Sequence, residues 1–175
     1  MNKIKLMFLA LPLFIMTGCK SDDDEPQDYQ EWLDRNNAYV ADCQQSRDSQ
    51  GKPLYTRLDP SFAPGIYSLV RWHNDRSQTA ANLSPLDNST VKVNYQLHDI
   101  DGNLLDKGAG STFQPSGTVV GFWTTLTNMQ VGDTVTAVVP YEAGYGNVIH
   151  GSIKPYTTLI FSIRLKEIVG YEIKH

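Results

Sequence analysis

Alternation of apolar and polar residues predicts several antiparallel strands. Residues 91–98 alternate cleanly, with valine, tyrosine and leucine on one face and lysine, amide and histidine side chains on the other, as expected of a strand with one buried face. The Asp101-Gly102 pair that follows is a strong turn signal, so residues 103–106 are expected to return alongside it. Further strands are predicted at the β-branched or alternating segments 65–72, 134–139 and 159–165.

Helical spacing of apolar residues occurs in two segments. Residues 121–129 place Phe122, Leu126 and Met129 on one face and predict one short helix. Residues 29–45 spread apolar residues among charged and amide ones, which is compatible with an amphipathic helix whose apolar stripe lies on the domain or on a partner. Several strands wrapped on one short helix make an α+β domain.

A glycine-rich loop is predicted between the last two strands. Residues 140–146 read Pro-Tyr-Glu-Ala-Gly-Tyr-Gly, and residues 153–161 continue as Ile-Lys-Pro-Tyr-Thr-Thr-Leu-Ile-Phe. The glycines and prolines favour turns and remove side chains that would crowd a cavity. The stretch from 139 to 161 is therefore predicted to line a pocket that the sheet and the helix hold in place.

The first 18 residues have the pattern of a secretory signal, because two lysines precede an almost wholly apolar run. The run is too short to cross a hydrocarbon layer of roughly 30 Å. Residues 16–19, Met-Thr-Gly-Cys, resemble a bacterial lipobox, so we expect Cys19 to carry lipid and to anchor the protein to a membrane. Ordinary cleavage near Gly18, leaving a free thiol on Cys19, is the alternative.

An acidic tether is predicted over residues 19–27, since Lys-Ser-Asp-Asp-Asp-Glu-Pro cannot bury apolar area. Acidic residues directly after a lipidated cysteine resemble export signals of some Gram-negative lipoproteins, which indicates the outer membrane, at its periplasmic face or at the cell surface. A formal net charge of −4 argues against nucleic acid as a partner. Cys43 is the other cysteine and is predicted to be a buried or inert thiol.

Catalytic motifs for nucleophilic, zinc or phosphate chemistry are missing from the sequence. The four histidines are scattered, and each is expected to face solvent. No metal and no cofactor is expected. Aromatic and aliphatic residues are dense near the glycine hinges, a pattern that suits either a plain core or a concave apolar site.

Several short motifs keep a regular order along residues 67–168. They are Val-x-Val-x-Tyr at 91–95, Asp-Gly-x-x-Leu-Asp at 101–106, Val-Val-Gly-Phe at 119–122, Pro-x-x-x-Gly-Tyr-Gly at 140–146 and Ile-x-Pro-x-Thr-Thr-Leu-Ile-Phe at 153–161. This order resembles the FK506-binding-protein (FKBP) class of peptidyl-prolyl isomerases. The resemblance implies a five-stranded antiparallel sheet curled around one short helix over residues 64–170, preceded by a short helix and linker over residues 28–63.

The resemblance also implies an active site between the sheet and the helix. The catalytic positions that carry over are Tyr145, Asp106, Phe122 and Val119. The substrate-binding positions are Tyr95, Leu105, Phe113, Trp123, Ile153 and Phe161. By resemblance, the Tyr145 hydroxyl and the Val119 N–H donate to substrate, and Asp106 orients Tyr95 or the peptide. A loop-capping role for Tyr145 and a turn role for Asp106 are the structural alternatives.

Departures from the family pattern bear on catalytic strength. Phe122 stands where the family usually has tryptophan, and Trp123 would take that place if the alignment slipped by one residue. Leu105 replaces a phenylalanine, and Lys154 replaces the first proline of the usual Ile-Pro-Pro turn. These changes keep an apolar cavity but alter its fit.

Three functions fit the sequence. The first is an isomerase of proline-containing polypeptides that assists the folding of exported proteins; its chemistry needs no nucleophile, because the barrier arises from lost amide resonance. The second is a binding or chaperone module with weak or no isomerase activity, which the departures at Phe122 and Leu105 favour. The third is a scaffold component of a lipoprotein assembly. Neither client nor oligomeric state follows from the sequence.

Overall fold

The chain forms an α+β domain, as predicted. The computed structural model describes residues 29–171. Its elements are α1 (Gln30–Gln45), β1 (Thr56–Leu58), β2 (Ser68–Trp72), β3 (Thr90–His98), β4 (Leu104–Phe113), α2 (Val120–Asn128), β5 (Thr134–Val139) and β6 (Leu159–Gly170), with short 3₁₀ turns η1 (Pro115–Gly117) and η2 (Tyr141–Ala143). The predicted signal (residues 1–18), the predicted lipidation site at Cys19 and the predicted acidic tether (19–27) lie outside the described residues.

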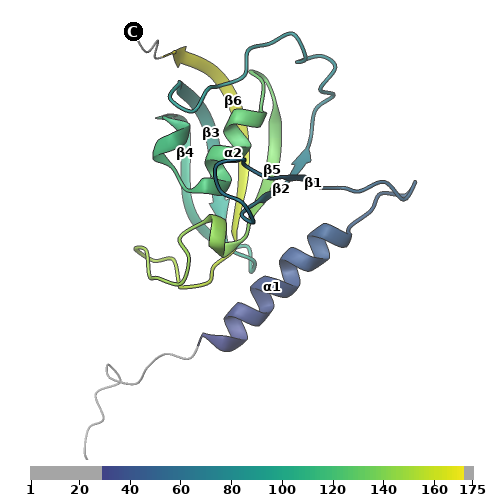
Figure 1. Cartoon of the computed structure of the whole chain (residues 1–175), viewed down its shortest axis with the longest axis vertical. Coiled ribbons are helices and arrows are strands. Elements are labelled where there is room, and N and C mark those ends of the chain that lie inside the picture. Colours follow the sequence, from purple (N-terminus) through teal and green to yellow (C-terminus); the bar gives the residue numbers. More distant parts are fainter. Residues whose placement is uncertain (1–28, 172–175) are drawn as a thin grey trace, which may run out of the picture.

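The strands form one antiparallel sheet in the order β1-β2-β5-β6-β3-β4, with α2 against one face (Figure 1). The sheet has six strands rather than the five that the resemblance implies. The additional strand is β1, which pairs Thr56 with Val70 and Leu58 with Ser68 in a segment predicted as linker. A three-residue edge strand carries too little alternation to be recognised in sequence.

The β3–β4 hairpin is longer than predicted. Strand β4 continues to Phe113, although its return was expected only as far as Asp106. Register shifts interrupt its pairing with β3, and Gly108 and Gly110 break the alternation in its sequence. Gly108 is needed for close approach: a Cβ atom there would lie 2.6 Å from Cε1 of Tyr95.

The main core lies between the sheet and α2. Phe122, Leu126 and Met129, the three residues predicted on one helical face, are all buried. They pack with inward-facing residues of β3, β5 and β6 in a single cluster. The helix start approaches β5 closely, because Gly121 carries no side chain to separate it from Val139.

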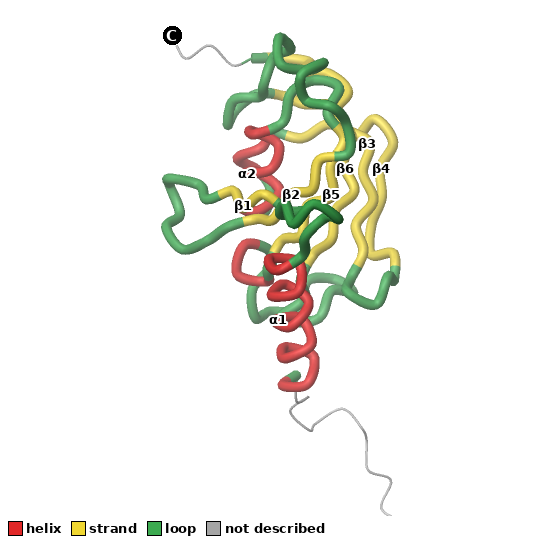
Figure 2. Tube along the Cα trace, turned by 90° about the vertical axis from the view of Figure 1, so that its right-hand side faces the viewer, coloured by secondary structure: helices red, strands yellow, loops and turns green. Residues whose placement is uncertain are grey.

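Helix α1 packs on its own domain, at the end of the sheet below α2 in both views (Figures 1 and 2). Val40 and Cys43 form a second buried cluster with Leu69 and Val138, on the sheet face opposite the main core. Cys43 is a buried free cysteine, and burial raises the pKa of its thiol. The predicted apolar stripe is therefore used within the chain, and the prediction of a buried thiol is confirmed.

Asn36 ties α1 to the segment that precedes β6. Its side chain is fully buried; Oδ1 accepts the Thr158 N–H at 2.7 Å, and Nδ2 donates to the Trp32 carbonyl at 2.7 Å. The Trp32 indole N–H donates to Thr157 Oγ1 at 3.1 Å. The base of the loop between β5 and β6 is thus hydrogen-bonded to α1.

Replacing Asn36 by alanine is expected to lower the free energy of unfolding by about 1–3 kcal/mol, because the buried Thr158 N–H loses its acceptor. Urea denaturation of both proteins measures the difference. Asn37→Ala is the matched control, since Asn37 is exposed on the next helical position and should change stability by less than about 0.5 kcal/mol. Equal effects of the two substitutions would contradict the bracing role.

No helix within residues 29–171 is long and apolar enough to cross a membrane.

Candidate active site

A cavity of about 440 Å³ opens between β3 and β4, the start of α2 and the loop before β6. It is lined by Tyr95, Leu97, Asp106, Phe113, Gly117, Thr118, Val119, Phe122, Tyr145, His150 and Phe161. The fold thereby brings together seven of the predicted site residues: Tyr95, Asp106, Phe113, Val119, Phe122, Tyr145 and Phe161.

Aromatic rings form the floor and walls of the cavity. Phe122 is only 3% exposed and contacts Phe161 with ring centroids 4.7 Å apart. Phe113 meets Phe122 edge to face at 5.6 Å and Tyr95 at 5.5 Å. Such edge-to-face contacts are favourable between ring quadrupoles and hold each ring in place. These contacts give the cavity a preformed apolar floor and walls.

Two tyrosine hydroxyls and a carboxylate form one polar edge. Tyr95 donates to Asp106 Oδ2 at 2.6 Å, while Asp106 Oδ1 accepts the N–H of Lys107 at 2.7 Å. Burial, followed by the hydrogen bond to Asp106, raises the pKa of Tyr95 to about 12. Burial and the nearby Asp106 charge also raise the pKa of Tyr145. Both tyrosines are therefore neutral hydrogen-bond donors near neutral pH.

The loop that carries Tyr145 is closed at its base. Gly146 donates its N–H to the Tyr141 carbonyl at 2.8 Å and accepts the Tyr156 N–H at 2.9 Å. This path requires a φ of +71° at Gly146, where glycine is unstrained. The Tyr145 ring stacks on His150 with centroids 3.9 Å apart. Its hydroxyl has no acceptor within the described part of the chain.

Three predicted site residues lie elsewhere. Leu105 and Ile153 pack with the core and do not line the cavity. Trp123 points away from it, because successive residues of a helix are about 100° apart around the axis. Its ring stacks on Phe62, and its indole N–H donates to Asp87 Oδ1 at 2.6 Å. Phe122 forms the floor, so the one-residue slip that would bring in Trp123 does not occur.

Four lining residues were not predicted as site residues: Leu97, Gly117, Thr118 and His150. Leu97 shares the inward face of β3 with Tyr95, a signal that the alternation already contained. His150 is exposed, as expected, and it also reaches the rim of the cavity. Its backbone bridges to Ile153, with the His150 N–H donating at 3.0 Å, and this folds the loop back over Tyr145.

The N–H of Val119 is a further potential donor at the cavity. Val119 precedes the first residue of α2 and has extended backbone geometry. Its N–H donates to no other residue in the range 29–171. The same described residues contain no group of three His, Cys, Asp or Glu side chains that could hold a metal ion.

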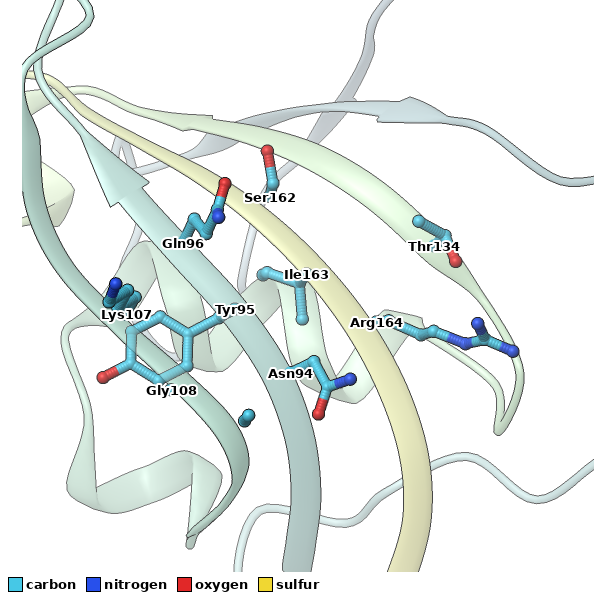
Figure 3. Close-up of a pocket in the computed structure, with 10 residues that line it drawn as sticks. Asn94, Tyr95, Gln96, Lys107, Gly108, Thr134, Ser162, Ile163 and Arg164 are labelled. Atoms are coloured by element: carbon cyan, nitrogen blue, oxygen red, sulfur yellow. The ribbon is translucent and has the colours of Figure 1, made fainter.

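A second hollow, of about 640 Å³, lies on the face of the sheet away from α2. Figure 3 shows Asn94 and Gln96 on β3 together with Ser162 and Arg164 on β6; these residues alternate with the inward-facing ones. Of the residues that the structure describes, Tyr95 is the single aromatic one that borders it, so they give this hollow no aromatic floor comparable to that of the first cavity.

Comparisons with known proteins agree with this geometry. Residues 82–166 match the family model of FKBP-type peptidyl-prolyl cis-trans isomerases. We call residues 82–166 the FKBP-type domain, after the family model that they match. The members of this family are isomerases. Every residue that lines the cavity of about 440 Å³, which we call the aromatic cavity, lies within the FKBP-type domain.

Relatives of the FKBP-type domain include two curated proteins of Escherichia coli strain K12. The FKBP-type peptidyl-prolyl cis-trans isomerase FkpA is 33% identical over 89 residues, which is 49% of this chain and 33% of FkpA. The FKBP-type 22 kDa peptidyl-prolyl cis-trans isomerase is 34% identical over 90 residues, 49% of this chain and 44% of that protein. The chain thus matches less than half the length of either relative.

Solved structures share the fold of the FKBP-type domain. A peptidyl-prolyl cis-trans isomerase from Pseudomonas syringae superposes with a TM-score of 0.64 at 23% identity, covering 82% of this chain and 98% of that one. FkpA from Escherichia coli superposes with a TM-score of 0.55 at 25% identity, covering 79% of this chain and 63% of FkpA.

Proposed function

We propose that this protein is a peptidyl-prolyl cis-trans isomerase that acts on Xaa-Pro bonds of polypeptides. The observation that carries the proposal is the aromatic cavity with Phe122 as its floor and a neutral Tyr145 hydroxyl at its edge. A prolyl ring is compact and apolar, so it suits an apolar cavity of this kind. The match of residues 82–166 to a family of peptidyl-prolyl cis-trans isomerases supports the same reaction.

The cavity lowers the rotation barrier without covalent chemistry. The uncatalysed barrier of about 18–20 kcal/mol reflects lost amide resonance in the twisted state. An apolar environment removes water from the planar, more polar imide, and hydrogen bonds that strengthen in the twisted state favour it selectively. The Tyr145 hydroxyl and the Val119 N–H donate to carbonyl groups beside the proline, and Asp106 orients Tyr95.

Replacing Tyr145 by phenylalanine is expected to lower kcat/KM by roughly tenfold, because one hydrogen bond of about 1–1.5 kcal/mol is lost while the ring remains. NMR exchange or a protease-coupled assay on an Xaa-Pro peptide measures the rate. Tyr141→Phe is the matched control, since Tyr141 lies in the same loop but does not line the cavity. A wild-type rate indistinguishable from buffer would overturn the isomerase proposal.

A binding or chaperone module without turnover is the second candidate. It is favoured by Phe122 at the floor, where the family usually has tryptophan, because a smaller ring changes how tightly a proline is enclosed. It predicts that proline-containing or unfolded segments bind at the cavity with no acceleration of exchange. Peptide titration followed by NMR shifts, run beside the exchange assay, separates the two functions.

The site of action proposed for the chain is the cell envelope, where it assists the folding of exported proteins from a lipid anchor on Cys19 in the outer membrane. The support is the signal pattern, the lipobox-like residues 16–19 and the acidic run after them. In cells, Cys19→Ala is expected to move the protein from the membrane fraction to the soluble fraction and to remove incorporation of labelled fatty acid. Unchanged fractionation would contradict the anchor.

A further inference from the structure

A third hollow, of about 750 Å³, lies beside α2 and outside the aromatic cavity. Pro85, Leu86, Asp87, Ser116 and Trp123 contribute to its walls. Leu86 is 56% exposed, and Phe62, which stacks on Trp123, is 49% exposed. We call this site the outer hollow. Large apolar side chains left exposed around a pocket are typical of binding surfaces.

Trp123 is held rigidly in the outer hollow. The segment between β1 and β2 passes across α2 (Figure 1) and places Phe62 on the indole, with ring centroids 4.0 Å apart and planes 23° apart. The hydrogen bond from the indole N–H to Asp87 fixes the ring in its plane. A ring that is already ordered loses little conformational entropy on binding a ligand.

The outer hollow and the aromatic cavity share one wall. Ser116 borders the outer hollow, while the next three residues, 117–119, border the aromatic cavity. On α2, Phe122 faces the aromatic cavity and the next residue, Trp123, faces the outer hollow. The N–H of Ser116 donates to the Asp87 carbonyl at 2.9 Å, which fastens this wall to the residues of the outer hollow. A single main-chain segment thus separates the two sites.

We propose that the outer hollow is a second contact site for the client polypeptide, where it takes an aromatic or aliphatic side chain near the proline bound in the aromatic cavity. This inference rests on the proposed isomerase function. An extended peptide advances about 3.3 Å per residue. Side chains two to four residues from the proline therefore reach roughly 7–13 Å beyond it, enough to cross one segment of main chain.

The chemistry of the outer hollow selects among client sequences. Trp123, Leu86 and Pro85 offer apolar contacts, which favours leucine, phenylalanine or a further proline in the client. Among residues 29–171, Asp87 is the single charged one that borders this hollow. An acidic client side chain at this position is disfavoured, because two like charges repel. The site thus adds a sequence preference to a reaction that needs only an Xaa-Pro bond.

Two peptide series test the proposal on the full chain. The first is a short Xaa-Pro peptide that fills only the aromatic cavity. The second has the same Xaa-Pro bond in a longer peptide, with phenylalanine or aspartate placed two, three or four residues before or after the proline. For the wild type, phenylalanine at one of these positions is expected to raise kcat/KM three- to tenfold over the aspartate peptide.

The variants Leu86→Ser and Phe62→Ala are expected to reduce this advantage at least twofold while the rate on the short peptide stays unchanged; the part that remains is the repulsion between Asp87 and the aspartate peptide. Leu86 is exposed, so its replacement should leave the fold intact. An advantage of the same size in both variants and the wild type, or one that no position of phenylalanine produces, overturns the outer hollow as a client site.

Binding is followed separately from turnover through the NMR shift of the Trp123 indole N–H during titration with the longer peptides. If the short peptide is not turned over by the wild type, the proposed isomerase function fails. The phenylalanine peptide should then still shift this resonance, whereas the aspartate peptide should not. No difference between the two shifts would overturn the client site independently of catalysis.

Discussion

Replacing Phe122 by alanine is expected to lower the free energy of unfolding by about 3–5 kcal/mol, the usual cost of deleting a buried phenylalanine ring. Phe122 is 3% exposed and contacts the rings of Phe113 and Phe161. The same ring is the floor of the aromatic cavity, so the variant also loses apolar contact with a bound proline. That contact is worth about 2 kcal/mol, which corresponds to a roughly thirtyfold lower kcat/KM.

Stability and turnover of this variant are measured separately. Urea denaturation gives the free energy of unfolding. NMR exchange on an Xaa-Pro peptide is run without denaturant, after the spectrum of the variant has shown that it is folded. Phe122→Trp is the matched substitution, because it keeps an aromatic floor; a rise in rate would show that the phenylalanine limits catalysis. Unchanged turnover in Phe122→Ala would remove Phe122 from the site.

Replacing Gly121 by alanine is expected to destabilise the domain by about 1–3 kcal/mol through overpacking. A Cβ atom at this position would lie 2.3 Å from Cγ1 and 2.8 Å from Cγ2 of Val139. Alanine favours a helix over glycine by about 1 kcal/mol, but a contact this short forces α2 away from β5. Because Phe122 is the next residue, the shift should also displace the cavity floor and lower the rate.

A double-mutant cycle separates this clash from a general effect of the substitution. Val139→Ala alone removes buried methyl groups and should itself cost about 1–3 kcal/mol. In the double variant, the smaller side chain at position 139 leaves room for the methyl group added at position 121. The total loss of unfolding free energy should therefore be smaller than the sum of the single losses by at least about 1 kcal/mol. Additive losses in urea denaturation would contradict the close approach of α2 and β5.

Much of the site could be predicted because its signals are local or carried by ordered motifs. The alternation of residues 91–98 places Tyr95 inward, and the glycines around Tyr145 allow a loop that folds over a cavity. The resemblance added the pairing of these segments with Asp106 and Phe161. All four residues line the cavity.

The contacts of His150 and Trp123 could not be predicted from the sequence. His150 is exposed, as expected of a histidine in a loop, but the turn at residues 150–153 also brings it onto the ring of Tyr145. Trp123 resembles the usual floor residue in type, whereas its position in α2 directs it to Phe62 and Asp87. The contacts of Trp123 join segments distant in sequence, whereas the contact of His150 with Tyr145 forms within one loop.

The sequence by itself determined the fold class and the short helix of residues 121–129, because periodicity and turn chemistry act between near neighbours in the chain and can be recognised without coordinates. Its resemblance to a known family indicated most residues of the aromatic cavity. Tertiary structure alone decided which aromatic residue of α2 forms the floor, how α1 braces the Tyr145 loop through Asn36, and that β1 joins the sheet. These features depend on the rotation and close packing of whole elements, which single residue patterns do not specify.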